Sequence, residues 1–435
     1  VILDKLKEKG VLEMKKWGQV FVLTGSIVAM LITGTGCSKK NTGIKNEKLA
    51  SDYMELFNMS EGIKTEEGCF KIRDGICYYV DFGEEKAIPL CNKPECRHLS
   101  EAEDPDTECN AVSDEDMYIF PYGDRLYEIA ENEDGTVLTS SALDRTDRKE
   151  VKQLMDIYGK FGQGVVVKNR LIYTVSKVAD VQNAEELNDF TMTRSIECLN
   201  LDTLETEVYV DAGICDGLQL LGGTEEYQVY SVIKNYEGFF YILDYKTGKS
   251  KEISLHTADG YKKIVPADQE KIFYYEDWEV SPDGEKSSTV WRYDIEKSKE
   301  EVLLKKEEIQ GAEEESSIRL IGIREDGILC EAGDVLYLVD KDSHQVNKKV
   351  SLMEVLPVTD AKEVRLDFVT EDAAYLAYEI TNRTTGDESD WISWDGVIRM
   401  DDLLNGKKAV KVLIAPRMSS AGNPVDEDGN MTGSK

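Results

Sequence analysis

Apolar and aromatic residues recur in short runs from about residue 65 onward, and each run is followed by turn-forming residues. Alternating or aromatic runs of this kind predict β-strands. Later in each unit, a strand ends on an apolar residue and an aspartate. We expect that carboxylate to accept local backbone N–H groups in a turn, which is a structural role. The runs lie at residues 76–80, 170–175, 271–275, 327–330 and 374–378, and the closing aspartates are Asp144, Asp202, Asp244, Asp294, Asp340 and Asp401.

The spacing of these aspartates predicts a repeat architecture. Successive members are 42 to 61 residues apart, which suits propeller blades of four strands each. One such sheet cannot bury its two apolar faces alone, whereas blades stacked around an axis bury both. Helical patterning is nearly absent, which argues against an α/β fold. We therefore expect an all-β fold: a β-propeller over residues 65–413 with about seven four-stranded blades, six or eight staying open, and a flexible C-terminal tail over residues 414–435.

Two motifs carry a resemblance to a known superfamily. Residues 281–284 read Ser-Pro-Asp-Gly, and residues 291–294 read Trp-Arg-Tyr-Asp. The chain resembles the TolB-like and WD40-like propellers, whose repeats contain this turn and a Tyr-x-apolar-Asp strand end; the other blades lack the turn. It is also similar to a group of Gram-positive surface lipoproteins with a propeller behind the lipid. That resemblance implies a fold class and a binding role.

Residues 14–37 predict export and attachment to a membrane. Lys15 and Lys16 precede an apolar run over residues 20–32, and small residues then lead to Cys37. This order is typical of a secretory signal peptide, and the run is shorter than the ~20 residues that a spanning helix needs. The Gly-Cys pair at residues 36–37 resembles the lipobox of bacterial lipoproteins, although Gly34 stands where that family usually has Leu. The resemblance implies a diacylglycerol on the Cys37 thiol.

We therefore expect a signal peptide over residues 1–36, of which residues 1–13 are an over-extended start ahead of Met14. Residues 37–64 are then a lipid-anchored tether. The lipid would be the contact with the membrane and would hold the protein on the extracytoplasmic face of a bacterial cell. An ordinary signal peptide or a single membrane anchor stays open as an alternative.

Charge excludes some partners. The chain has 52 Lys and Arg residues against 85 Asp and Glu residues, a net charge of −33. Removing residues 1–36 leaves 47 against 82, so the net charge of the mature chain is −35. Such an acidic chain is not expected to bind nucleic acid, because that binding depends on neutralising phosphates with Lys and Arg. Broad adhesion to anionic lipid is disfavoured for the same reason.

The most specific cluster of chemically active side chains is Cys91, Cys96, His98 and Cys109, in an acidic stretch between the first two blades. Three thiolates and one imidazole suit Zn²⁺, and four protein ligands fill a tetrahedral structural site without leaving a position open for catalysis. Disulfides are the rival interpretation, because the expected compartment is oxidising. Unpaired structural thiols are a third.

Cys69 and Cys77 are not expected to form a disulfide. A two-residue turn at residues 74–75 places Cys77 opposite Ile72 and Cys69 opposite Val80, on opposite faces of the hairpin. Cys77, Cys198 and Cys330 lie in apolar strand contexts and are predicted to be buried.

Trp278, Trp391 and Trp394 are the candidate ligand-binding residues, because they lie near predicted turns and flat rings can anchor a ligand. Trp391 and Trp394 differ by an odd number, so in one strand they would point to opposite faces. No catalytic residue is assigned: the chain lacks a Gly-x-Ser-x-Gly elbow and has three histidines. We expect a non-catalytic binding module for a glycan, peptide or protein at the cell surface. The alternatives are a propeller glycosidase or lyase with a carboxylate pair in the central funnel, and a structural partner in an envelope complex.

Overall fold

The structure is a computed structural model. The chain divides into two units, residues 1–43 and 44–435, and the description concerns the second. The residues described are 49, 51–57, 62–113, 117–179, 191–256, 264–266, 271–280, 286–309, 318–341, 343, 345–382, 384–386 and 389–432. The predicted signal peptide, Cys37 and the Ser-Pro-Asp-Gly turn at residues 281–284 lie outside this part.

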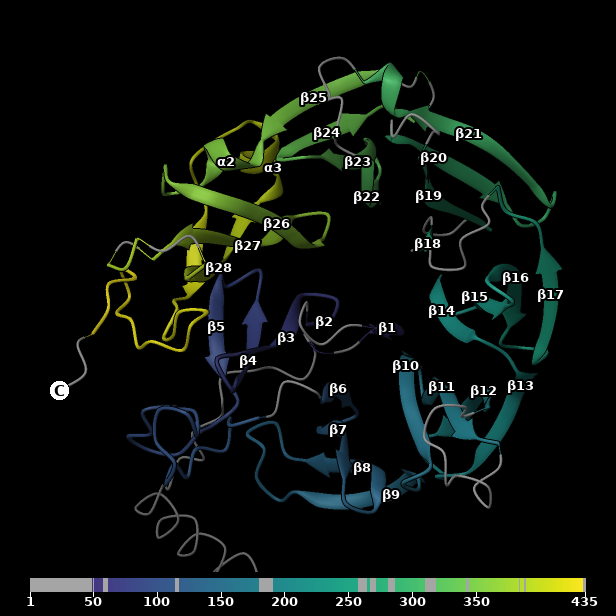
Figure 1. The fold of residues 1–435 in the computed structure, drawn as a ribbon, viewed down its shortest axis with the longest axis horizontal. Helices are drawn as coiled ribbons and strands as arrows, with labels where there is room; N and C mark the ends of the chain where they lie inside the picture. Colours follow the sequence, from purple (N-terminus) through teal and green to yellow (C-terminus); the bar gives the residue numbers. More distant parts are fainter. Residues whose placement is uncertain are drawn as a thin grey trace, which may run out of the picture. The chain divides into compact units, whose positions relative to one another are not determined.

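The described strands form seven antiparallel sheets arranged as the blades of a propeller (Figure 1), which confirms the predicted fold class and blade number. Within each blade, the strands are hydrogen-bonded in chain order. The first three blades are β2 (Ile63–Lys64), β3 (Gly68–Arg73), β4 (Ile76–Asp81) and β5 (Lys86–Pro89); β6 (Tyr118–Tyr122), β7 (Arg125–Asn132), β8 (Gly135–Ser141) and β9 (Lys149–Met155); and β10 (Gly159–Val167), β11 (Arg170–Val178), β12 (Met192–Asn200) and β13 (Thr206–Ile214).

The next four blades repeat this plan. They are β14 (Gly217–Gly223), β15 (Tyr227–Lys234), β16 (Glu237–Asp244) and β17 (Lys249–Ile253); β18 (Ile264–Pro266), β19 (Ile272–Val280), β20 (Lys286–Asp294) and β21 (Lys299–Lys305); β22 (Ile318–Arg324), β23 (Gly327–Ala332), β24 (Val335–Val339) and β25 (Val346–Ser351); and β26 (Ala361–Val369), β27 (Ala373–Thr381), β28 (Trp391–Arg399) and β29 (Lys411–Ile414). The helices of the described part are short: η4 (Lys306–Glu308), α2 (Leu352–Val355) and α3 (Met400–Leu404). None of them has the length and apolar character needed to cross a membrane.

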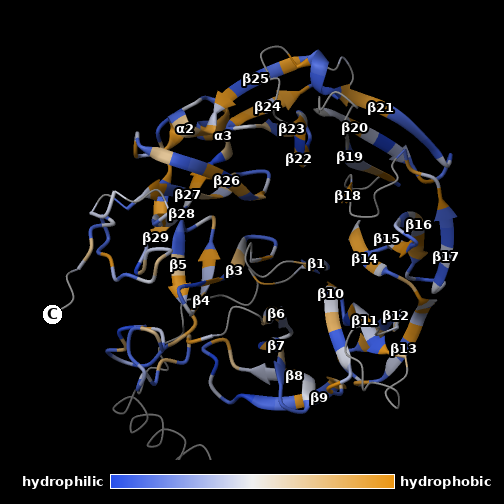
Figure 2. Cartoon of the chain, viewed as in Figure 1, coloured by the Kyte–Doolittle hydropathy of each residue, from blue (hydrophilic) through white to orange (hydrophobic). Residues whose placement is uncertain are grey.

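The cores of the blades follow the alternation that the sequence predicts. All six residues of β4 are buried, whereas four of the five residues of the outer strand β17 are exposed. Figure 2 shows the same contrast, with β9, β17 and β21 coloured largely as hydrophilic. The sheets therefore bury their inner strands between neighbouring blades and leave the outer strands to water.

The repeated aspartates lie at the end of the third strand of their blades or one to three residues after it. The side chains of Asp144, Asp244, Asp294 and Asp340 each accept an N–H bond from two or three residues further on, at 3.1, 2.8, 3.0 and 2.7 Å. This confirms the predicted turn role for these four. Asp202 differs, since it accepts from the side chain of Asn169 at 2.8 Å. In the first blade, Asp81 makes the same turn contact to Glu84 N–H, at 2.8 Å.

The hairpin of β3 and β4 has the predicted register, because Cys69 pairs with Val80 and Cys77 pairs with Ile72. Cys77, Cys198 and Cys330 are buried, as expected. All cysteines of the described part are free thiols.

One strand lies outside the blade repeat. β1 (Tyr53–Leu56) pairs antiparallel with β10, from Tyr53 opposite Val167 to Leu56 opposite Gly164. Figure 1 shows it on the inner side of β10, toward the middle of the ring. Both β1 and β2 fall within the stretch predicted as a tether, so the folded part begins earlier than the expected boundary at residue 65.

The predicted C-terminal tail is also packed against the ring. Met418 pairs with Pro424 and Val425 pairs with Met431 in isolated bridges. Val425 is buried in a cluster with Trp394. Turn-rich composition suggested a tail, but the apolar side chains of Val425 and Met431 and the backbone contacts hold this segment against the ring.

The first and last blades meet without sharing a strand, because each is formed by four strands that follow one another in the chain. At this seam, Lys71 of β3 lies between Asp367 of β26 and Asp395 of β28, with Nζ–O distances of 2.8 and 3.2 Å. All three side chains are at least 97% buried. The ring of Tyr375 lies 5.2 Å from Lys71 Nζ.

Burial acts to lower the pKa of Lys71, but the charges of Asp395 and Asp367 outweigh it, so this pKa lies above its ordinary value. The lysine is therefore charged in the folded protein. It compensates two carboxylates that have no access to water.

Replacing Lys71 by Met is expected to lower the free energy of unfolding by about 3–5 kcal/mol, because it removes the only fully buried cation of the cluster. Asp395 and Asp367 then keep only the more exposed Arg73 and Arg365 as partners. Urea denaturation measures this change. The matched control is Lys411→Met, which removes an exposed ion pair with Glu85 across the same seam and should cost about 0–1 kcal/mol. Equal effects of the two substitutions would contradict the role of the buried cluster.

Candidate metal centre

The loop that holds the three cysteines and His98 connects β5 of the first blade to β6 of the second. Backbone hydrogen bonds fasten it to the hairpin of β3 and β4: Leu90 N–H donates to Cys77 O at 3.0 Å, and Cys77 N–H donates to Ala111 O at 2.8 Å. Ser113 N–H donates to Gly75 O at 3.0 Å. Both ends of the loop are therefore anchored on one rigid strand pair.

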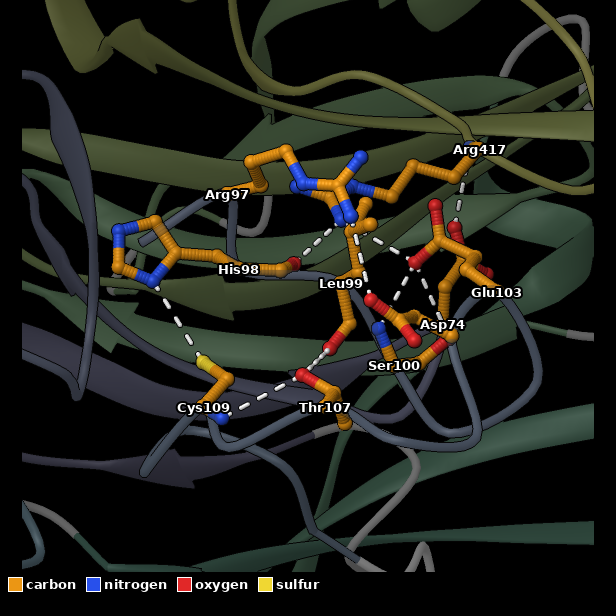
Figure 3. Close-up of polar contacts among 10 residues, drawn as sticks. Asp74, Arg97, His98, Leu99, Ser100, Glu103, Thr107, Cys109 and Arg417 are labelled. Carbon is orange, nitrogen blue, oxygen red and sulfur yellow. Dashed lines mark hydrogen bonds and ion pairs between the residues drawn. The ribbon is translucent and has the colours of Figure 1, made fainter. Parts of the chain in front are cut away.

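The structure brings the four predicted ligands together. One ligand atom from each of Cys91, Cys96, His98 and Cys109 lies within 4.8 Å of the other three. Cys109 Sγ is 3.5 Å from His98 Nδ1 (Figure 3). Cys91 and Cys109 are buried, and the other two are half-buried. This Cys₃His cluster could hold a metal ion.

A tight turn returns the chain from Cys91 to Cys96. Cys96 N–H donates to Lys93 O at 3.3 Å, and Glu95 has a φ of 61°. His98 has a φ of 53°. Left-handed backbone at two residues that carry side chains is unfavourable unless the surroundings hold it. The backbone is therefore strained at Glu95 and His98, where the chain turns to bring the cysteine and histidine side chains together.

The surroundings of the cluster shift the pKa values of its groups in different directions. Burial acts to raise the pKa of Cys91, but the N–H groups of Lys93 and Asn110 and the neighbouring thiols outweigh it, so the pKa falls below its ordinary value. Burial raises the pKa of Cys109 to about 12. Burial and the positive charge of Arg417 lower the pKa of His98. A bound cation would favour ionisation of the remaining thiols.

Polar contacts hold the rest of the loop (Figure 3). The Glu103 carboxylate accepts hydrogen bonds from Ser100 N–H and Oγ–H, at 2.9 and 3.0 Å. Thr107 Oγ1 donates to Leu99 O at 3.1 Å and accepts from Cys109 N–H at 3.3 Å. The loop is therefore organised by hydrogen bonds around the ligand cluster.

Arg417 is a part of this site that sequence reasoning missed. Its guanidinium donates to Glu103 Oε2 at 3.2 Å and to the backbone oxygen of His98. The backbone N–H of Arg417 donates to Asp74 Oδ2 at 3.1 Å. No local motif marks Arg417, since it lies more than 300 residues beyond its partners.

The predicted ligand-binding tryptophans differ in exposure. Trp391, the first residue of β28, is 42% exposed, whereas Trp394 is 6% exposed. This agrees with the expected opposite directions of the two rings. Trp394 stacks on Tyr378 with ring centroids 5.7 Å apart and donates from Nε1 to Glu427 O at 3.4 Å. Trp278 lies in β19 opposite Ser288, and its side chain is outside the described part.

A large cavity of about 1580 Å³ lies at the other end of the propeller. Its lining includes turns between the first and second strands of a blade, such as the turn between β14 and β15. The loop between β5 and β6, called the cysteine loop below, instead contacts Gly75, which lies in the turn between the second and third strands of its blade. Successive turns of a meander alternate between the two ends of a blade, so the cavity and the cysteine loop lie at opposite ends. Residues from separate blades meet in its lining, among them Glu55, Lys64, Glu226, Lys271, Arg292 and Glu371.

The chain was compared with protein families, curated protein sequences and solved structures. No protein-family model matches the chain, and no curated protein sequence matches it. The chain is similar to a prolyl endopeptidase structure, with 11% identity and a TM-score of 0.50, over 92% of this chain and 55% of that one. An oligogalacturonate lyase in complex with manganese matches at 12% identity and a TM-score of 0.42, over 69% and 79% of the two chains.

A putative TolB from Agrobacterium tumefaciens matches at 9% identity and a TM-score of 0.31, over 58% of this chain and 88% of that one. At these identities, the likeness concerns the fold alone. The fold and the site together define the class: a seven-bladed β-propeller with a Cys₃His cluster in the loop between its first two blades.

Proposed function

We propose that the protein is a lipid-anchored, extracytoplasmic β-propeller that binds a glycan, peptide or protein partner at the cell surface without catalysis. The cavity of about 1580 Å³ carries this proposal. It is formed by turns from several blades, and such loops on a rigid scaffold are the usual place for binding sites. Its mixed charged lining suits a polar ligand.

Pairing among the charged residues supports binding rather than chemistry. Asp294 pairs with Lys297 at 2.7 Å, and Arg292 pairs with Glu301 at 2.8 Å. Glu371, also in the lining, pairs with an arginine at 3.3 Å. These groups neutralise one another around the cavity instead of converging on one reacting atom, as a catalytic constellation requires.

If the cavity is the binding site, a bulky side chain at its rim should block it. A thermal-shift screen of the chain from Ser38 onward, with cell-wall oligosaccharides and peptides, is expected to find a ligand that stabilises by about 2.7 kcal/mol at 100 times its Kd. Glu226→Trp should abolish the shift. The matched control is Glu237→Trp, an exposed position at the other end of the same blade, outside the cavity lining. A shift that persists in Glu226→Trp would argue against this site.

The lipid anchor rests on the sequence order around Cys37. Replacing Cys37 by Ser removes the thiol that would carry the lipid, so the protein should move from the membrane fraction to the medium. Immunoblotting of fractionated cells measures the change. Ser38→Ala is the control and should leave the protein on the membrane. Unchanged retention of the Cys37 variant would overturn the anchor.

We propose that the ion held by the Cys₃His cluster is Zn²⁺ and that its role is structural. Thiolate and imidazole ligands suit zinc, and four protein ligands close the coordination shell. The half-buried cluster, the N–H groups directed at Cys91 and the polar loop around it support this assignment. A metal cross-link would add stability to a loop that has a small apolar core of its own.

The purified chain from Ser38 onward is therefore expected to contain about one zinc per molecule, measured by plasma emission spectroscopy. Cys109→Ser should lose the metal and lower the melting temperature. Cys198→Ala, which changes a buried thiol in another blade, should keep it. A disulfide among Cys91, Cys96 and Cys109 in metal-free protein, found by mass spectrometry, would contradict the zinc site.

A further inference from the structure

The C-terminal segment, residues 415–432, covers an aromatic pair on blade seven. Trp394 lies flat on Tyr378, with an interplanar angle of 9°, and is 6% exposed. Glu427 O accepts the indole N–H. A Cβ added to Gly429 would lie 2.8 Å from the Trp394 ring, so the backbone of this segment lies directly against the indole. Residues 427–429 therefore shield the Tyr378–Trp394 pair from solvent.

Two groups of contacts fasten this cover. At β28, Ser420 N–H donates to Trp391 O at 2.8 Å, and Trp391 N–H donates to Ser420 Oγ at 2.9 Å. Ala421 N–H donates to Asp390 Oδ1 at 3.3 Å. These contacts belong to blade seven itself and do not involve the cysteine loop.

The second group is Arg417, which joins the cover to the cysteine loop. Of its three acceptors, Asp74 belongs to the hairpin turn of blade one, while His98 and Glu103 belong to the loop. His98 is also a ligand of the cluster, and its backbone oxygen receives the guanidinium. Figure 3 shows the Arg417 side chain extending to these two residues. Two of its three contacts therefore depend on the shape of the loop.

We infer that the metal centre controls the cover: a bound metal holds the loop in the shape that fastens Arg417, and its loss frees the C-terminal segment from the Tyr378–Trp394 pair. This inference rests on the metal site proposed above. Hydrogen bonds to charged groups are among the stronger ones in proteins, so losing two of them shifts the cover markedly toward its open state. The aromatic pair becomes accessible as the segment leaves.

Trypsin cleavage after Arg417 tests this inference, because a protease cuts the opened segment and releases residues 418–435. The rate is measured with and without chelator on the chain from Ser38 onward, with zinc content determined on the same sample. The exposed Lys246, in the turn between β16 and β17, is the internal reference. Removal of the metal is expected to speed cleavage after Arg417 by at least about tenfold and to leave cleavage after Lys246 unchanged.

Two variants separate the cover from the metal. Glu103→Gln removes the ion pair of Arg417 without touching a ligand, so it should speed cleavage while zinc content stays at its original level. Gly429→Ala should also speed cleavage, because both its φ of 79° and the Trp394 ring oppose a Cβ. Gly422→Ala has a similar φ of 77° but open space around it, and it should have the smaller effect.

The outcomes distinguish the two proposals. Zinc-loaded protein whose cleavage after Arg417 is unaffected by chelation, with confirmed loss of zinc, would overturn the inference and leave the metal site intact. Protein that never contains metal would overturn both. A Glu103→Gln variant that is cleaved at the original rate would show that Arg417 does not fasten the cover and would also overturn the inference.

Discussion

Closure of the ring depends on the contact between its first and last blades. Each blade is a complete meander of consecutive strands, so no strand is shared between the two ends of the repeat, and side chains must close the circle. Lys71 does so by inserting one positive charge between Asp367 and Asp395, with all three groups out of water. A buried cation between two carboxylates tolerates little displacement, because separation would leave charge uncompensated in a low-dielectric interior.

A line of charged groups connects the seam to the Cys₃His cluster. Arg73 lies 3.5 Å from Asp395 and 4.0 Å from Asp74. Asp74 accepts from the backbone of Arg417, whose guanidinium reaches Glu103 in the cysteine loop. The Cys₃His cluster and the C-terminal cover thus lie at one end of the propeller and the cavity at the opposite end, while Lys71, Asp367 and Asp395 lie within the strands between them.

Local physics made much of the fold predictable. A two-residue turn determines hairpin register, so the pairing of Cys69 with Val80 followed from the sequence. The turn aspartates and the four residues of the Cys₃His cluster likewise involve neighbours within a few dozen residues. The seam could not be foreseen, because Lys71 and Asp395 are isolated polar residues within apolar strands and no periodicity links them. The same holds for Arg417 and for β1, whose partner strand is more than 100 residues further along the chain.

The antiparallel pairing of β1 with β10 has a mechanical consequence. Tyr53 lies opposite Val167, at the end of β10 where the cavity opens, so the chain enters the ring through the cavity mouth and then runs inward along β10. A pull on the chain ahead of β1, directed along the strand, would load the ladder of hydrogen bonds in shear. The bonds would share the force and have to fail together, whereas a strand pulled sideways is peeled one bond at a time. The lipid anchor proposed at Cys37 would load the protein in the stronger of these two geometries.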